Sequence, residues 1–183
     1  MKKPILLALS LMLLMLGLTS CNKDQDAKVC VAYFSYSGVT KAVAETLAQV
    51  TDATLYEIVP EEAYGDDTMN YNDENARAFK EQMGTAPQRP AIKKTFKGAK
   101  ECDVLLLGFP VWYGKAPRVI LSFLEAYSFD GKTVIPFCTS DSSTIDSSET
   151  ELKTTFPAIN WRHGDRLNDL SVAQLKSWYE SLN

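Results

Sequence analysis

A turn rich in small and hydroxyl-bearing residues has the composition of a phosphate-binding site. It consists of Ser35, Tyr36, Ser37, Gly38, Val39 and Thr40. The turn follows an apolar stretch, residues 29–34, that predicts a strand, and it precedes an amphipathic segment that predicts a helix. Unpaired N–H groups and the positive dipole end of a helix N-terminus favour an anion at such a junction. The hydroxyls add neutral donors, and Gly38 permits positive φ and close backbone approach.

No Lys or Arg lies within this turn, which narrows the kind of phosphate that it could hold. The nucleotide-binding pattern Gly-x-x-x-x-Gly-Lys-Ser/Thr and the dinucleotide pattern Gly-x-Gly-x-x-Gly are both absent from the chain. The turn therefore favours a phosphate monoester held by neutral donors. A Ser/Gly turn that only caps a helix has the same composition, so the alternative of a purely structural cap stays open.

A second turn carries two aromatic residues and follows another apolar run, residues 103–109. It includes Pro110, Val111, Trp112, Tyr113 and Gly114. On an open parallel sheet, ligands bind at the carboxyl ends of the strands, so both turns are expected at one edge. Trp112 and Tyr113 could stack on a flat ring there, although aromatic loop residues also often cover apolar surface.

Strand and helix patterns alternate along the chain, which predicts an α/β fold. Strands are expected at residues 29–34, 54–59, 104–109, 133–137 and 158–162, and the mixed polar pattern of 54–59 indicates an edge strand. Helices are expected after Thr40, after Pro117, after Ser148 with a Ser148/Glu151 capping box, and after Ser171. Alternation with right-handed crossovers places helices on both faces of a parallel sheet. Pro136 conflicts with a strand interior, because proline removes a ladder donor.

Three motifs in order resemble those of the flavodoxin family, and the resemblance covers nearly everything after Lys28. Ser35, Ser37, Gly38 and Thr40 match the family's FMN-phosphate motif, and residues 108–114 resemble a flavin-stacking segment of its short flavodoxin-like bacterial branch. Residues 131–140 resemble the branch's fourth strand and third loop, which implies that Thr139, Ser140 and Asp141 also contact the cofactor. The resemblance implies a doubly wound sandwich with a five-stranded parallel sheet of order 2-1-3-4-5, and FMN as the cofactor.

The third loop departs from the family pattern. Where the family has a glycine-rich run after Thr139 and Ser140, this chain has residues 141–146, with Asp141 and Asp146 among them. Glycine allows close approach and positive φ, so its loss puts flavin affinity in doubt. If FMN binds, either carboxylate near the pyrimidine edge would lower the reduction potential, by the same repulsion that shifts a pKa beside a like charge.

The N-terminus resembles a bacterial lipoprotein signal. Lys2 and Lys3 precede an apolar stretch, residues 5–18, whose length of about fourteen residues is too short to span a membrane. Small residues then lead to Cys21. We therefore expect a signal peptide at residues 1–20, lipidation at Cys21, a tether at 21–27 and the folded domain at 28–183. This predicts an exported protein of the cell envelope held to the membrane by acyl chains, with the outer membrane as the default location.

The remaining composition describes one soluble domain. The net charge of −4 becomes −6 once Lys2 and Lys3 leave with the signal, which argues against nucleic acid as a partner. The long segment 60–98 begins with acidic residues and is expected to project beside the aromatic turn. There it could dock a basic redox partner, or it could equally be a solvated loop of an acidic protein. Helical spacing of Ala76, Phe79 and Met83 predicts the crossover helix within this segment.

The cysteines of the domain allow one disulfide to be considered. A Cys30–Cys102 disulfide is conceivable, but free buried thiols are the more common case.

Three functions are compatible with this sequence. The leading hypothesis is an FMN-binding electron-transfer protein that exchanges electrons with an unidentified redox protein or membrane donor. The second is an FMN-dependent reductase that uses NAD(P)H and a quinone-type acceptor. The third is a binding lipoprotein that kept the fold and lost the flavin. Absorption by a bound flavin separates the first two from the third, and NADPH oxidation separates the first from the second.

Overall fold

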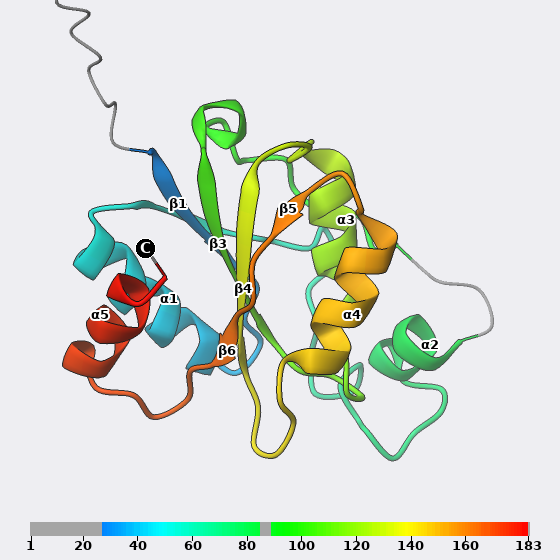
Figure 1. The fold of residues 1–183 in the computed structure, drawn as a ribbon. Helices are drawn as coiled ribbons and strands as arrows, with labels where there is room; N and C mark the ends of the chain where they lie inside the picture. The colour runs from blue at the N-terminus through cyan, green and yellow to red at the C-terminus, as the bar shows by residue number, and fades with distance from the viewer. Residues whose placement is uncertain (1–26, 85–88, 183) are drawn as a thin grey trace, which may run out of the picture.

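The computed structural model describes residues 27–84 and 89–182, and its centre is a parallel sheet (Figure 1). The strands are β1 (Val29–Tyr33), β2 (Thr54–Glu57), β3 (Val104–Pro110), β4 (Thr133–Thr139), β5 (Asn160–Trp161) and β6 (Asp165–Arg166). Their order is β2-β1-β3-β4-β5, and β6 also pairs with β4. The predicted fold class and strand order are confirmed, including the edge position of β2.

Helices cover both faces of the sheet (Figure 1). Helices α1 (Val39–Thr51) and α5 (Val172–Glu180) lie on one face, and α3 (Arg118–Ala126) and α4 (Asp146–Thr155) lie on the other. Successive residues of a strand face opposite helix layers. Val31 and Leu106 pack on the side of α1 and α5, whereas Ala32 and Leu107 pack on the side of α3. All four of these side chains are fully buried. This two-sided burial explains the nearly continuous apolar runs of β1 and β3.

The fifth strand is split in two, which corrects the continuous strand expected at residues 158–162. The carbonyls of Val134 and Cys138 on β4 accept from Arg162 N and Leu167 N at 3.0 and 2.9 Å. Pro136 lies between them, so its backbone faces the same neighbour, but it has no N–H to donate. Gly164 lies against this point, and a Cβ there would be 1.6 Å from the Pro136 carbonyl oxygen. The proline that conflicted with a regular strand is thus accommodated by the interruption between β5 and β6.

Helix α4 begins earlier than expected, and the predicted Ser148/Glu151 capping box is wrong. The helix starts at Asp146, which places Ser148 within its first turn, where the side chain is completely buried. The next residue, Glu149, also faces inward, because its carboxylate accepts a hydrogen bond from Gly164 N at 2.6 Å. Burial of these two side chains fixes the rotation of the helix. By contrast, the cap predicted at Ser171 is confirmed as a capping box with Gln174.

The segment between β2 and β3 contains helix α2 (Arg77–Met83), which lies outside the layer formed by α3 and α4 (Figure 1). The helix is where the spacing predicted it, but its buried face is different. Ala78, Glu81 and Gln82 are buried, whereas Met83 is 57% exposed. A short 3-10 helix, η1 (Ala99–Glu101), leads into β3.

Several sequence predictions fall on residues outside the described ranges. The signal peptide, Cys21 and all of the tether except Ala27 are among them. Within residues 27–84 and 89–182, no helix combines the length and hydropathy that a membrane span requires. Cys30, Cys102 and Cys138 are free buried thiols, so Cys30 and Cys102 do not form the disulfide that was considered.

Candidate functional site

Three loops meet at the carboxyl-terminal edge of the sheet and enclose an open cavity of about 540 Å³. They follow β1, β3 and β4, the three central strands of the sheet. A volume of this size is typical of small-molecule and cofactor sites. The sequence-predicted residues that line it are Tyr36, Ser37, Val39, Pro110, Val111, Trp112, Tyr113, Gly114, Thr139, Ser140 and Asp141. No Lys or Arg is among its lining residues as the described part of the chain defines them.

The loop after β1 leads directly into the N-terminus of α1. Gly38 is the N-cap, with φ +90°, and a Cβ at this position would meet no atom within 4 Å. Its N–H donates to Ser35 Oγ at 3.1 Å, so Ser35 shapes the loop instead of lining the cavity. Tyr36, Ser37 and Val39 are exposed at the cavity edge. The loop thus presents hydroxyls and unshielded backbone beside a helix N-terminus.

Thr40 joins the first loop to the third instead of lining the cavity. Its side chain is almost fully buried, and its Oγ1 lies 2.7 Å from Thr139 Oγ1, on the last residue of β4. Thr139 does line the cavity. A buried hydroxyl pair fixes the relative position of the two loops, because either partner alone would leave an unsatisfied polar group.

The loop after β3 is a tight hairpin. Trp112 N and Lys115 N donate to each other's carbonyl oxygens at 2.9 and 3.0 Å, and both central residues, Tyr113 and Gly114, have positive φ of 49° and 77°. This is the geometry of a type I′ turn, in which glycine is favoured at the second central position. Tyr113 in the left-handed region is a strained residue, and such strain often accompanies a functional loop.

The two aromatic side chains of this hairpin have different surroundings. Trp112 is 3% exposed, and its ring packs edge-to-face on Phe34 and Tyr64, with centroids 5.3 and 4.9 Å apart. Tyr113 is half-buried and contacts Tyr71, whose ring centroid lies 4.9 Å away. Its hydroxyl is buried without a hydrogen-bond partner in the described structure, and burial raises its pKa. Trp112 is therefore mainly a core residue, while Tyr113 is the aromatic side chain available to a ligand.

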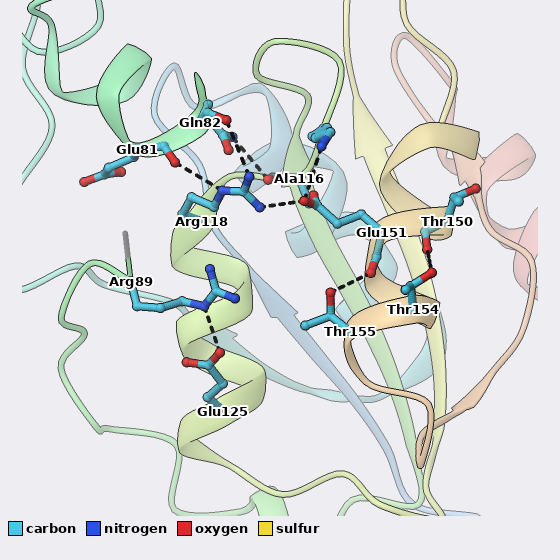
Figure 2. Close-up of polar contacts among 11 residues, drawn as sticks. Glu81, Gln82, Arg89, Ala116, Arg118, Glu125, Thr150, Glu151, Thr154 and Thr155 are labelled. Carbon is cyan, nitrogen blue, oxygen red and sulfur yellow. Dashed lines mark hydrogen bonds and ion pairs between the residues drawn. The ribbon is translucent and has the colours of Figure 1, made fainter. Parts of the chain in front are cut away.

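The buried Arg118 is the centre of a charge network next to the hairpin, and Figure 2 shows its contacts with α2 and with Glu151. The Arg118 guanidinium, at the start of α3, donates to the carbonyls of Glu81 and Gln82 at 3.1 and 3.4 Å. It also pairs with the Glu151 carboxylate of α4 at 2.7 Å, and Lys115 of the hairpin reaches the same carboxylate oxygen at 3.4 Å. The arginine therefore joins α2, α3 and α4, and it fixes the base of the aromatic turn.

The loop after β4 lines the remaining wall with polar residues. Asp141 is exposed at the cavity, whereas Asp146 lies in the first turn of α4, where its carboxylate accepts from the Thr144 hydroxyl at 2.7 Å. Of the two carboxylates expected near a ligand, only Asp141 lines the cavity. Residues 141–146 all have negative φ, so the missing glycines cause no strain of that kind.

Further lining residues were not predicted individually. Asp66, Met69 and Tyr71 come from the acidic segment, which lies beside the aromatic turn as expected, and Tyr36 donates to Asp66 at 2.6 Å. This hydrogen bond raises the pKa of Tyr36. The acidic composition of the segment and its expected position were the signals for these residues. Asn168, Ser142 and Ser143 complete the cavity wall, and nothing in the sequence pattern singled out Asn168.

Comparison with protein families supports one assignment. A family model described as flavodoxin matches residues 28–182 of this chain. The chain belongs to the flavodoxin family. The site described above lies at the carboxyl ends of β1, β3 and β4 of this flavodoxin-family domain.

Solved structures of proteins named as flavoproteins share this fold. A crystal structure from Bacteroides uniformis, named as a candidate flavoprotein, is 41% identical, with a TM-score of 0.80 over 84% of this chain and 98% of the other. One from Bacteroides eggerthii, named likewise, is 38% identical, with a TM-score of 0.81 over 85% and 98%. A Lactobacillus acidophilus flavoprotein in complex with FMN is 22% identical, with a TM-score of 0.61 over 84% and 99%, and shows the fold alone. No curated protein sequence matches the chain.

Proposed function

We propose that this protein is an FMN-binding electron-transfer protein of the flavodoxin family. The observation that carries the proposal is the convergence of three loops on one cavity of about 540 Å³. One end of the cavity offers hydroxyls and a helix N-terminus, and another offers Tyr113 and Tyr71. A ligand with a phosphate at one end and a flat ring at the other satisfies both ends. The flavoprotein complex with FMN from Lactobacillus acidophilus supports the choice of this cofactor.

The donor set fits the phosphate of FMN. Ser37 and the N-terminus of α1 provide donors, and the open space beside Gly38 leaves the backbone accessible. The absence of cationic side chains from the described cavity wall suits a monoester bound through neutral groups. Ser35 and Thr40 support this end indirectly, through Gly38 N and Thr139 Oγ1.

The other two loops fit the ring system. Tyr113 and Val111 offer apolar surface, and Ser140 and Asp141 offer polar groups on the same cavity wall. Bound FMN would supply one-electron or two-electron chemistry that no side chain provides. The residues of this chain would hold the cofactor, exclude water from one side of it and set the local charge, while the open cavity leaves an edge accessible to a partner.

Titration of the mature domain with FMN tests this function directly. We expect a yellow protein whose affinity for FMN falls about tenfold in Ser37→Ala, the loss of one hydrogen bond to a charged group, while riboflavin affinity changes little. Ser147→Ala, on the exposed face of α4, is the matched control and should bind both ligands normally. If the mature domain bound no flavin, the alternative of a flavin-free binding lipoprotein would explain the structure better. Rapid NADPH oxidation with a quinone would instead identify a reductase.

We also propose that the protein is exported and anchored through an acylated Cys21, with the outer membrane as its location. The motif at residues 1–21 supports this, and a short tether would leave the domain free to meet a redox protein or membrane donor. Metabolic labelling with a clickable palmitate analogue should mark the wild-type protein and spare Cys21→Ser. An unlabelled wild type, or a soluble one after fractionation, would contradict the anchor.

A further inference from the structure

The wall formed by the third loop is held by side chains from the segment that follows β6. The backbone ladder between β4 and β6 ends where Leu167 N donates to the Cys138 carbonyl at 2.9 Å. Two side chains then continue the pairing to Ser140. Arg166 Nη1 donates to the Ser140 carbonyl, and Asn168 Oδ1 accepts from Ser140 N, both at 2.8 Å. Both backbone groups of Ser140 are therefore fixed without glycine in the loop.

The contact with Ser140 determines how the Asn168 amide is oriented. Ser140 N is a donor, so the atom that faces it must be the amide oxygen, and this removes the usual ambiguity of an asparagine side chain. The amide NH₂ group then points away from Ser140. It has no hydrogen-bond partner among the described residues, and Asn168 is a half-buried lining residue of the cavity. The wall thus carries a preorganised, unused double donor.

Neighbouring donors on this wall are either engaged or free to rotate, because the hydroxyls of Ser140, Ser142 and Ser143 can turn in any direction. Ser140 Oγ accepts from Ser142 N and Ser143 N at 3.4 and 3.0 Å, which turns those N–H groups toward the loop itself. Asp141 is an acceptor when ionised. Among the side-chain donors of this wall, the Asn168 amide is the one whose orientation is fixed in advance, by its contact with Ser140 N.

We propose that Asn168 is a cofactor-recognition residue, which holds Ser140 N through its amide oxygen and donates from its amide nitrogen to a pyrimidine-ring carbonyl of the bound flavin. This inference rests on the proposed function. The two roles belong to different atoms of one amide, so they can be separated by substitution. Asn168→Asp keeps an oxygen for Ser140 N and removes the donor, whereas Asn168→Ala removes both.

Flavin titration and infrared spectroscopy test the proposal. We expect Asn168→Asp to bind FMN and riboflavin about tenfold more weakly, since the lost donor serves the ring that both ligands share. The carbonyl stretching band of bound FMN should move to higher frequency, because a hydrogen bond to the carbonyl is lost. Asn168→Ala should lose more affinity than Asn168→Asp.

A matched control comes from the opposite end of the sheet. Asn160 pairs with Thr133 at the start of β4 and donates to its hydroxyl at 3.1 Å, so Asn160→Asp makes the same chemical change far from the cavity. Its flavin affinity and carbonyl band should match the wild type.

Two outcomes would overturn the proposal. In the first, Asn168→Asp binds flavin normally with an unchanged carbonyl band and only Asn168→Ala loses affinity, which would mean that Asn168 merely supports the loop. In the second, Asn168→Asp and Asn168→Ala both bind flavin normally. A wild-type domain that binds no flavin would defeat the proposed function instead, so the two failures are distinguishable.

Discussion

At the scale of single residues, the site depends on a few side chains whose surroundings decide what they can do. Asp141 and Asp146 look equivalent in the sequence, but only the first lines the cavity. Trp112 and Tyr113 are adjacent, but the first is enclosed by Phe34 and Tyr64. The sequence predicted the loops that meet at this cavity, and three-dimensional packing determines which of their residues line it.

The position of Asp141 predicts an effect on the reduction potential of bound FMN. Asp141→Asn removes a negative charge from the cavity wall, so added electrons meet less repulsion and the potential should rise by roughly 20 to 40 mV, the Coulomb energy of one solvated charge several ångströms away. Redox titration measures this. Asp146→Asn is the control, since that carboxylate lies outside the cavity wall and accepts from Thr144. Equal shifts in the two variants would contradict the assignment.

Glu149 is the residue at which stability should depend on acid. Burial alone would raise its pKa, but hydrogen bonds from Lys153, Gly164 N and His163 prevail and hold the pKa below the ordinary value of a glutamate. A depressed folded-state pKa gives stability that is present above about pH 4.5 and is lost as the pH falls through the folded value. Glu149→Gln should therefore cost about 1 to 3 kcal/mol at pH 7 and less at pH 3, where part of the advantage of the carboxylate is already lost.

Urea unfolding at the two pH values checks the Glu149 prediction. Glu45→Gln is the control, because Glu45 forms only an exposed pair with Lys41 at 3.9 Å and should change stability little at either pH. If Glu149→Gln lowered the unfolding free energy by the same amount at both pH values, its effect would come from packing and not from ionisation.

At the scale of elements, local patterns predicted most of the structure, and long-range contacts account for the errors. The apolar runs of β1, β3 and β4 and the cap at Ser171 are local signals, and the structure confirms them. The split fifth strand and the early start of α4 both depend on contacts between β4, α4 and the Gly164 region, which no local pattern encodes. The same distinction applies to the site, because Tyr71 and Asn168 reach it from distant segments.

Gly164 is the element-scale position at which a substitution should be most damaging. A Cβ there would lie 1.6 Å from the Pro136 carbonyl oxygen and 2.7 Å from its carbon, and both atoms belong to backbone that cannot rotate away. Gly164→Ala should therefore destabilise the fold by about 3 kcal/mol or more, as overpacking of a rigid site does. Urea unfolding measures the loss.

Gly65→Ala provides the comparison for this substitution. Its new Cβ would meet only the Asp67 side chain, at 3.1 Å, which is flexible and free to move. The expected change in unfolding free energy is within about 0.5 kcal/mol, as for most surface substitutions. If Gly164→Ala changed the unfolding free energy as little as Gly65→Ala, the prediction would be wrong. The backbone of β4 could then move away from residue 164 at little cost.

At the scale of the whole molecule, the cavity collects segments that are far apart in the chain. The loops after β1, β3 and β4, the acidic segment and the Asn168 region all line it. A ligand that contacts these segments binds the folded state and has no comparable site on the unfolded chain. Flavin binding should therefore act on the stability of the entire domain, and not only on its loops.

This coupling predicts a defined increase in stability. At a free FMN concentration of about one hundred times Kd, the unfolding free energy should rise by about 2.7 kcal/mol, and the urea midpoint should move upward with an unchanged m value. Inorganic phosphate, which can occupy only the end formed by Ser37 and the N-terminus of α1, should give a smaller increase at any given concentration. A raised m value with FMN would instead show that the cofactor orders loops that are open in the free protein, since m follows the surface exposed on unfolding. An unchanged midpoint would contradict specific binding to the folded domain.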